Sequence, residues 1–141
     1  MDHMQALDDL IAAHAGREGP LLPILNDVQA AFGCIDEPAI RHIAAALNLS
    51  RAEVHGVVSF YHDYRAVPTP RPIIRLCRAE ACQARGADAL AAAMAPVAAG
   101  RASIESVYCL GLCSVGPNAM VGGALHARLD AQSLAALVEA L

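Results

Sequence analysis

Apolar residues recur with helical spacing over the first part of the chain. Four groups follow the spacing of amphipathic helices: Met4, Leu7, Leu10, Ile11 and His14; Leu21, Leu25, Val28 and Phe32; Ile40, Ile43 and Leu47; and Val54, Val57, Val58 and Tyr61. Gly33 is expected to end the second helix, and the acidic segment before Pro38 to begin the third. Ser50 and Glu53 have the spacing of a capping box for the fourth. We therefore predict a small four-helix bundle over residues 1–66.

The pattern changes after residue 66. Pro68, Pro70 and Pro72 predict an extended connector, so we expect two domains, residues 1–66 and 67–141. The elements predicted beyond the connector are a strand over 73–76, an Ala-rich helix over 86–94 that stops near Pro96, a strand over 103–108, a hairpin of 119–121 and 125–128, and a helix over 130–141 with Leu134, Leu137, Val138 and Leu141 inward. This order, written β-α-β-β-α, is the layout of a thioredoxin-like domain, and the predicted fold class is α+β.

Composition and charge exclude several classes of function. The chain has 141 residues with 14 acids and 10 bases, and every base is Arg. The net charge of −4 and the scattered Arg residues argue against nucleic acid as a partner. Residues 106–127 contain no Asp, Glu, Lys or Arg, but four glycines and Pro117 interrupt the segment, so membrane insertion is not expected.

The start of the chain lacks the features of an export signal. Asp8 and Asp9 interrupt both the basic and the apolar regions that a signal peptide needs. We therefore expect a cytoplasmic location, where thiols stay reduced. In such a compartment five cysteines indicate metal or redox chemistry rather than a disulfide framework.

Four of the five cysteines form two closely spaced pairs. Cys77 and Cys82 are separated by four residues, and Cys109 and Cys113 by three. Each pair begins where a predicted strand ends, so the two loops leave one edge of the sheet if the strands are neighbours. Four sulfurs could then converge on one site. Such a set of soft thiolate ligands favours an iron–sulfur cluster or zinc and excludes hard cations.

A [2Fe-2S] cluster fits the two pairs best. It needs four thiolates and backbone N–H groups near the sulfurs, and Gly111 and Gly116 would let the backbone approach closely. Structural zinc also takes four cysteines, although its pairs usually have shorter spacing on hairpin turns. A dithiol redox site would need C-x-x-C at a helix start, which the sequence lacks. Both alternatives stay open at this point, as do four buried thiols without a ligand. With zinc the chain would be a Zn-stabilised interaction module without a redox role.

Other candidate residues have simpler interpretations. Cys34 is interpreted as a small buried hydrophobe rather than a ligand. The six histidines are scattered, and apart from His55 and His62 none has metal-ligand spacing to another, so surface or capping roles are expected. Three arginines surround the first cysteine pair, where they either solvate the loop or stabilise an anionic cluster and an acidic partner surface: Arg75, Arg78 and Arg85.

Three segments resemble a known family. Residues 54–61, 77–86 and 108–113 are similar to the thioredoxin-like [2Fe-2S] subunit of respiratory complex I and its homologues. Within that family, the run from Glu80 to Gln83 is most similar to the gamma subunit of soluble NAD-dependent, molybdenum-containing formate dehydrogenases. The resemblance implies one low-potential [2Fe-2S] cluster, on Cys77, Cys82, Cys109 and Cys113, and a partner flavoprotein that binds FMN and NAD.

The chain is expected to transfer electrons and not to oxidise a substrate itself. Its sequence contains no dinucleotide fingerprint, phosphate loop or catalytic triad. Hydride chemistry would then belong to the partner's flavin. The equivalent subunits of complex I and of NAD-linked hydrogenases are the alternatives for the parent complex. Phe60, Tyr61 and Tyr64 either pack in the core or anchor an interface.

Overall fold

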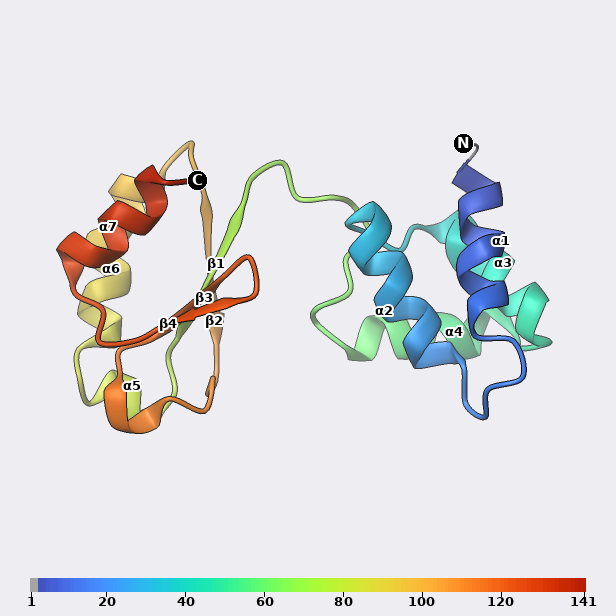
Figure 1. Cartoon of the computed structure of the whole chain (residues 1–141), viewed down its shortest axis with the longest axis horizontal. Helices are drawn as coiled ribbons and strands as arrows, with labels where there is room; N and C mark the ends of the chain where they lie inside the picture. The colour runs from blue at the N-terminus through green and yellow to red at the C-terminus, as the bar shows by residue number, and fades with distance from the viewer. Residues whose placement is uncertain (1–2) are drawn as a thin grey trace. The chain divides into compact units, whose positions relative to one another are not determined.

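The computed structural model describes residues 3–141 and divides into two compact units, Met1–Thr69 and Pro70–Leu141 (Figure 1). The division falls in an irregular segment between Tyr61 and Pro72, where the three prolines lie. The first unit contains α1 (His3–Ala13), α2 (Leu21–Phe32), α3 (Glu37–Leu47) and α4 (Arg51–Phe60).

The apolar faces of these helices share one core. Its fully buried side chains come from all four helices and include Leu7, Ile24, Leu25, Val28, Ile43 and Val54. Burying each such side chain contributes roughly 1.5–3 kcal/mol. Tyr61 differs from the prediction, because α4 ends at Phe60 and leaves the Tyr61 side chain 42% exposed.

The predicted helix ends are confirmed. Gly33 adopts a left-handed conformation (φ 72°) after α2. The Asp36 carboxylate accepts a hydrogen bond from the Ala39 N–H at the start of α3. Ser50 and Glu53 form a reciprocal capping box on α4. Each cap satisfies an N–H or C=O group that the helix itself leaves unpaired.

The second unit combines helices with a four-stranded mixed sheet. Its elements are β1 (Ile73–Cys77), α5 (Glu80–Gln83), α6 (Ala87–Ala98), β2 (Ser103–Val107), the 3-10 turn η1 (Cys113–Val115), β3 (Ala119–Val121), β4 (Ala124–His126) and α7 (Ala131–Glu139). The strand order is β2-β1-β3-β4, in which β1 and β2 are parallel and the other pairs antiparallel. Helices α6 and α7 cover one face of the sheet (Figure 1).

This order corrects the predicted β-α-β-β-α layout in several places. The hairpin supplies two strands, and the short helix α5 and turn η1 occupy the cysteine loops. Helix α6 continues through Pro96 to Ala98. Pro96 has no N–H group, so the helix loses the hydrogen bond to the Ala92 carbonyl. The φ angle of proline is nevertheless helical, and Pro96 lies close to the end of the helix, so the disruption is small. Leu141 is half exposed because α7 ends at Glu139.

Candidate metal centre

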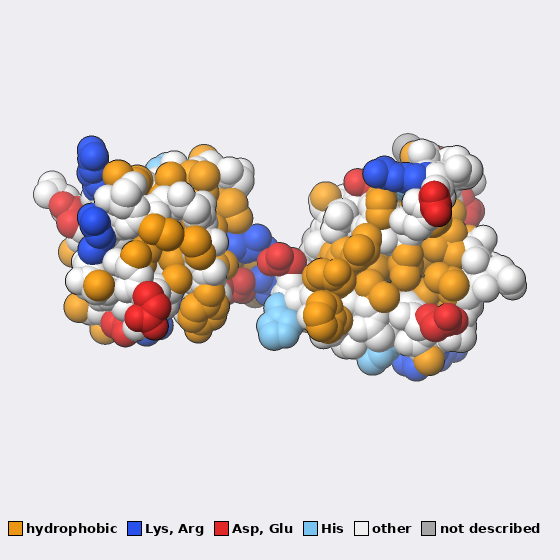
Figure 2. Space-filling model, turned by 90° about the horizontal axis from the view of Figure 1, so that it is seen from below, with side chains coloured by type: hydrophobic (Ala, Val, Ile, Leu, Met, Phe, Trp, Pro, Cys, Tyr) orange, Lys and Arg blue, Asp and Glu red, His pale blue; other side chains and the backbone are white. Residues whose placement is uncertain are grey.

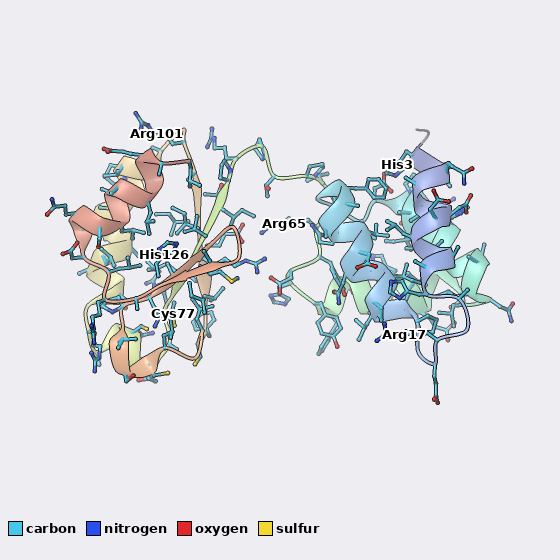
Figure 3. The ribbon with its side chains drawn as sticks, in the orientation of Figure 1. His3, Arg17, Arg65, Cys77, Arg101 and His126 are labelled. Carbon is cyan, nitrogen blue, oxygen red and sulfur yellow. The ribbon has the colours of Figure 1, made fainter. Side chains whose placement is uncertain are left out.

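Cys77 and Cys109 follow two neighbouring parallel strands. Cys77 is the last residue of β1 and pairs with Val107, the last residue of β2. Figure 3 labels Cys77 where β1 ends, and Cys109 lies two residues beyond β2. Because parallel strands have their carboxyl ends at one edge of the sheet, both cysteine loops start from the same edge, as predicted.

Two short elements carry the second cysteine of each pair. Cys82 lies in α5 and Cys113 begins η1, and these two elements contact each other. The contact brings the two cysteine loops together.

The four sulfurs are gathered in pairs. Cys109 Sγ and Cys113 Sγ lie 3.5 Å apart, and the Cys77 and Cys82 thiols hydrogen-bond to each other. Cys113 also interacts electrostatically with both Cys77 and Cys82. Among residues 3–141 no group of three or more His, Cys, Asp or Glu side chains is arranged around a single metal ion. The pairwise contacts match a two-iron cluster, in which each iron takes two protein ligands.

The two pairs differ in their access to solvent. The Cys77 and Cys82 side chains are each 1% exposed, whereas Cys109 and Cys113 lie at the surface. One side of the candidate centre is therefore dry and the other faces solvent. This asymmetry suits a group that must be protected yet reach an external redox partner.

Backbone N–H groups point at the buried sulfur of Cys77. Burial opposes ionisation of this thiol, but hydrogen bonds from the N–H groups of Ala79, Cys109 and Leu110 and from the Cys82 thiol outweigh burial and lower its pKa. The bond from Cys109 N to Cys77 Sγ measures 3.3 Å. The site is thus prepared to hold a thiolate before any metal arrives.

The neighbouring thiols ionise less readily. Burial, followed by the hydrogen bond to Cys77, raises the pKa of Cys82. The hydrogen bond to Cys109 is the main cause that raises the pKa of Cys113. Four thiolates this close repel one another, so full ionisation requires bound cations. The donor set therefore fits a thiolate-bound iron–sulfur group.

Glycines shape the loops around the sulfurs. A Cβ atom on Gly116 would lie 3.0 Å from Cys82 Sγ, so no other residue fits there without displacing the sulfur. Gly111 has φ +80° and its N–H donates to Cys109 Sγ at 3.4 Å. The backbone therefore approaches a sulfur closely at both glycines, as predicted. Gly116 leaves no room for a side chain beside Cys82, and the left-handed turn at Gly111 directs its N–H to Cys109 Sγ. Cys109 itself has φ 88°, which is uncommon for a residue with a side chain.

The structure adds Asn118, which the sequence reasoning missed. It is 1% exposed, and its Nδ2 donates to Cys82 Sγ at 3.4 Å. An Asn that follows Gly116 and Pro117 is typical of an exposed turn, so the sequence carries no signal of its burial.

The remaining candidate residues lie in ordinary environments. Cys34 belongs to the helical unit and is partly buried, where burial, and then Asp36, raises the pKa of its thiol. His14 pairs with Asp27 at 2.6 Å and His42 with Asp8 at 2.5 Å, so these two histidines have carboxylate partners.

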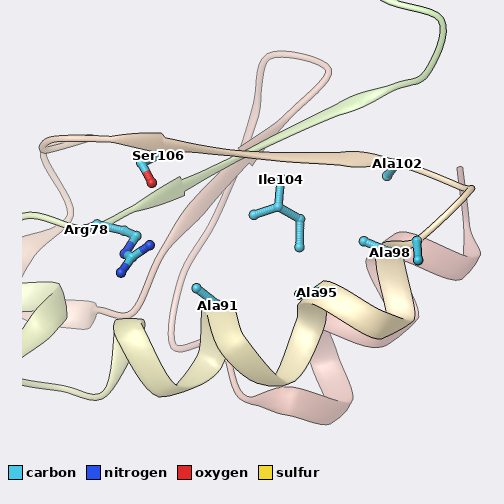
Figure 4. Close-up of a pocket in the computed structure, with 8 residues that line it drawn as sticks. Arg78, Ala91, Ala95, Ala98, Ala102, Ile104 and Ser106 are labelled. Atoms are coloured by element: carbon cyan, nitrogen blue, oxygen red, sulfur yellow. The ribbon is translucent and has the colours of Figure 1, made fainter.

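Arg78, beside the first cysteine pair, binds Asp88 at 2.8 Å. It also closes one end of a pocket of about 330 Å³ between α6 and β2, drawn in Figure 4. The pocket is lined mainly by alanines, including Ala91 and Ala95, together with the larger Ile104, and none of the cysteines lines it. The pocket is therefore not part of the candidate metal centre.

The described part of the chain contains no helix with the length and apolar character needed to cross a bilayer.

A thioredoxin-like sheet with four thiols in the loops at one edge defines a small iron–sulfur protein of the ferredoxin class. The chain belongs to the family of thioredoxin-like [2Fe-2S] ferredoxins, whose model matches residues 7–141.

Relatives of the chain are subunits of enzymes that use NADP or NADH. It is 30% identical over 122 residues to HndA of the NADP-reducing hydrogenase of Solidesulfovibrio fructosivorans, in a match that covers 80% of this chain and 71% of that protein. It is also 30% identical over 127 residues to subunit 2 of the NADH-quinone oxidoreductase of Thermus thermophilus, in a match that covers 82% and 70% of the two chains.

A similar solved structure is the NAD⁺-reducing [NiFe]-hydrogenase in the H₂-reduced state, with a TM-score of 0.70 and 26% identity. The match covers 85% of this chain and 22% of the hydrogenase chain, so this chain spans about a fifth of that longer protein.

Proposed function

We propose that the chain is an electron-transfer subunit that carries one [2Fe-2S] cluster on Cys77, Cys82, Cys109 and Cys113. The observation that carries the proposal is the pairwise gathering of these four sulfurs at one sheet edge, one pair buried and one pair exposed. Family membership supports the same cofactor.

The bound cluster would supply one-electron chemistry. The buried loop, with Gly116 against Cys82, excludes water from one side of the site. The N–H groups that point at the Cys77 and Cys109 sulfurs stabilise negative charge on them. The exposed sulfurs of Cys109 and Cys113 mark the side from which an electron enters or leaves.

The proposed partner is a flavoprotein that binds FMN and NAD. Tyr108, beside Cys109, is 74% exposed and is suited to anchor a partner at the cysteine loops.

In the helical unit, Phe60 is 74% exposed and stacks edge-on against Tyr61, with ring centroids 5.1 Å apart. Hydrophobic side chains gather on the face of this unit shown in Figure 2. We propose that residues 1–66 act as a small four-helix bundle that docks on the same flavoprotein.

The proposed parent enzyme is a cytoplasmic NAD-dependent formate dehydrogenase, with this chain as its gamma subunit. Support comes from the run Glu80 to Gln83, where Cys82 follows Glu80-Ala81. A second candidate is an NAD(P)-linked hydrogenase or the complex I type of enzyme, because relatives of this chain belong to such complexes.

Iron and sulfide analysis tests the cofactor. The purified chain is expected to hold two irons and two labile sulfides, and reduction with dithionite should give one spin-half paramagnetic signal. One zinc per chain without sulfide would replace the proposal with a structural zinc site.

Affinity purification from the native host, followed by activity assays of the isolated complex, tests the partner and the parent enzyme. We expect a larger flavoprotein to co-purify and the complex to reduce NAD⁺ with formate. Reduction with hydrogen instead would assign the chain to a hydrogenase. Isolation of the chain without a flavoprotein would contradict the docking proposal.

A further inference from the structure

Among the residues that the structure describes, Asn118 is the one polar or charged residue that is buried, and its environment is unusual. Its side chain is 1% exposed, and its Oδ1 atom has no hydrogen-bond partner. An unpaired buried acceptor opposes folding. The unfavourable burial of Asn118 must therefore be offset by a favourable interaction elsewhere. The groups that face its side-chain amide show which interaction this is.

The amide of Asn118 donates to both cysteine loops. Its Nδ2 lies 3.4 Å from Cys82 Sγ and 3.0 Å from the carbonyl oxygen of Leu112. Both partners are acceptors, so the opposite amide orientation would place Oδ1 against two acceptors and lose both bonds. The unpaired Oδ1 is therefore the consequence of using both N–H groups at the site.

The Leu112 carbonyl also accepts the Val115 N–H at 3.1 Å, the bond that closes turn η1. Asn118 thus holds the turn that carries Cys113. The backbone of Asn118 adds a third link, because its carbonyl accepts the Cys77 N–H at 2.9 Å. One residue therefore contacts the segments that carry Cys77, Cys82 and Cys113.

We infer that Asn118 is a positioning residue of the centre, which fixes the two cysteine loops to each other and donates an N–H group to the Cys82 sulfur. This inference rests on the proposed function. A donor at a ligand sulfur stabilises the more negative, reduced state of an iron–sulfur group and raises its reduction potential. Loss of the donor is expected to make the potential more negative.

The test uses the full chain with two near-isosteric substitutions. Asn118→Leu removes both donors, and Asn118→Asp replaces the amide nitrogen with an acceptor that repels the sulfur. Met120→Leu, a change of apolar side chain two residues further along the chain, in β3, is the control. The midpoint potential is measured by redox titration followed by paramagnetic resonance, after iron and sulfide content has been determined.

We expect the midpoint potential to fall in both Asn118 variants, and to fall further in Asn118→Asp than in Asn118→Leu. The control Met120→Leu should keep the wild-type potential. Wild-type potentials in both variants with full cluster content would overturn the inference, because a residue with a merely structural role would leave the potential in place.

A second measurement on the metal-free chain keeps the test independent of the cluster. Amide exchange of Val115 reports whether turn η1 is held by Asn118, and we expect it to increase severalfold in Asn118→Leu and not in the control. Unchanged exchange in a variant that fails to bind the cluster would also overturn the inference. If the wild-type chain itself binds no cluster, the proposed function fails, while the exchange measurement still decides whether Asn118 holds the loops.

Discussion

The cysteines of the candidate centre share one residue type but have different local environments. Cys77 receives several N–H groups, Cys82 is buried against Gly116, and Cys109 and Cys113 face solvent. The proposed cluster would take all four sulfurs as ligands, because water is a much weaker ligand of iron than a thiolate. The individual environments would then affect the potential and stability of the cluster more than its presence.

Substitution of each cysteine tests the ligand assignment. Alanine at Cys77, Cys82, Cys109 or Cys113 is expected to abolish the visible absorption and the paramagnetic signal of the purified chain. Cys34→Ala, the matched control, should leave both intact and cost about 1 kcal/mol or less, because this thiol is only partly buried. Bleaching by Cys34→Ala, or an intact spectrum in one of the other four variants, would contradict the assignment.

Gly116→Ala tests the close approach at Cys82. The new Cβ would lie 3.0 Å from Cys82 Sγ, so the sulfur or its loop must move. We expect iron content to fall or the paramagnetic signal to change shape.

Gly56→Ala is the control for this substitution, because open space surrounds that position in α4. Alanine there should raise stability by up to about 1 kcal/mol and leave the spectrum unchanged. Identical spectra for both variants and the wild type would show that the loop tolerates a side chain at Gly116.

At the scale of secondary-structure elements, ion pairs fasten α3 to α4. The Glu37 carboxylate at the start of α3 is bound by Arg51 of α4, with 2.5 Å between Oε1 and Nε, and by Arg41 of its own helix. Hydrogen bonds from Arg51, and then from Arg41, lower the pKa of Glu37 to about 2. The carboxylate is therefore favoured in the folded chain.

This pKa predicts a pH dependence of stability. A carboxyl group with a depressed folded pKa contributes stability above its ordinary value of 4.5, and that contribution is lost as pH falls toward about 2. As the pH is lowered over this range, the melting temperature of the metal-free chain should fall less in Glu37→Gln than in the wild type. The difference should shrink in high salt, because the pair is exposed. Parallel pH curves for the two proteins would show that the pair does not stabilise the fold.

At the scale of the whole molecule, the chain combines a sulfur-bearing unit with a helical unit that lacks the four paired cysteines. Its second unit contains all the candidate ligands, and its first unit has exposed aromatic rings at the end of α4. Exposed aromatic side chains that stack on each other are frequent anchors of interfaces.

Substitution of the aromatic pair tests the role of the helical unit. Phe60→Ser combined with Tyr61→Ser is expected to weaken binding to the flavoprotein at least tenfold, measured with the cluster-loaded full chain, and to leave the cluster spectrum unchanged. Leu125→Ser, on exposed β4, is the control and should bind as the wild type does. Full affinity of the aromatic variant would assign docking to the cysteine loops alone.

Local sequence patterns were sufficient to predict most helices, their caps and the two cysteine pairs. Apolar spacing determines which face of Ile40 to Leu47 is buried, and the local chemistry of Ser50 and Glu53 determines where α4 begins. These features depend on residues close together in the chain, so a local pattern reports them.

The surroundings of the candidate centre could not be predicted in this way, because they depend on contacts between separate parts of the chain. The burial of Asn118, the approach of Gly116 to Cys82 and the contrast between dry and exposed sulfurs join residues that are distant in sequence. Two further features differ from what the local sequence predicts. Helix α6 continues through Pro96, and the side chain of Tyr61 is exposed. Sequence patterns specify local periodicity and capping, whereas solvent access and sulfur contacts arise only when the sheet brings separate loops to one edge.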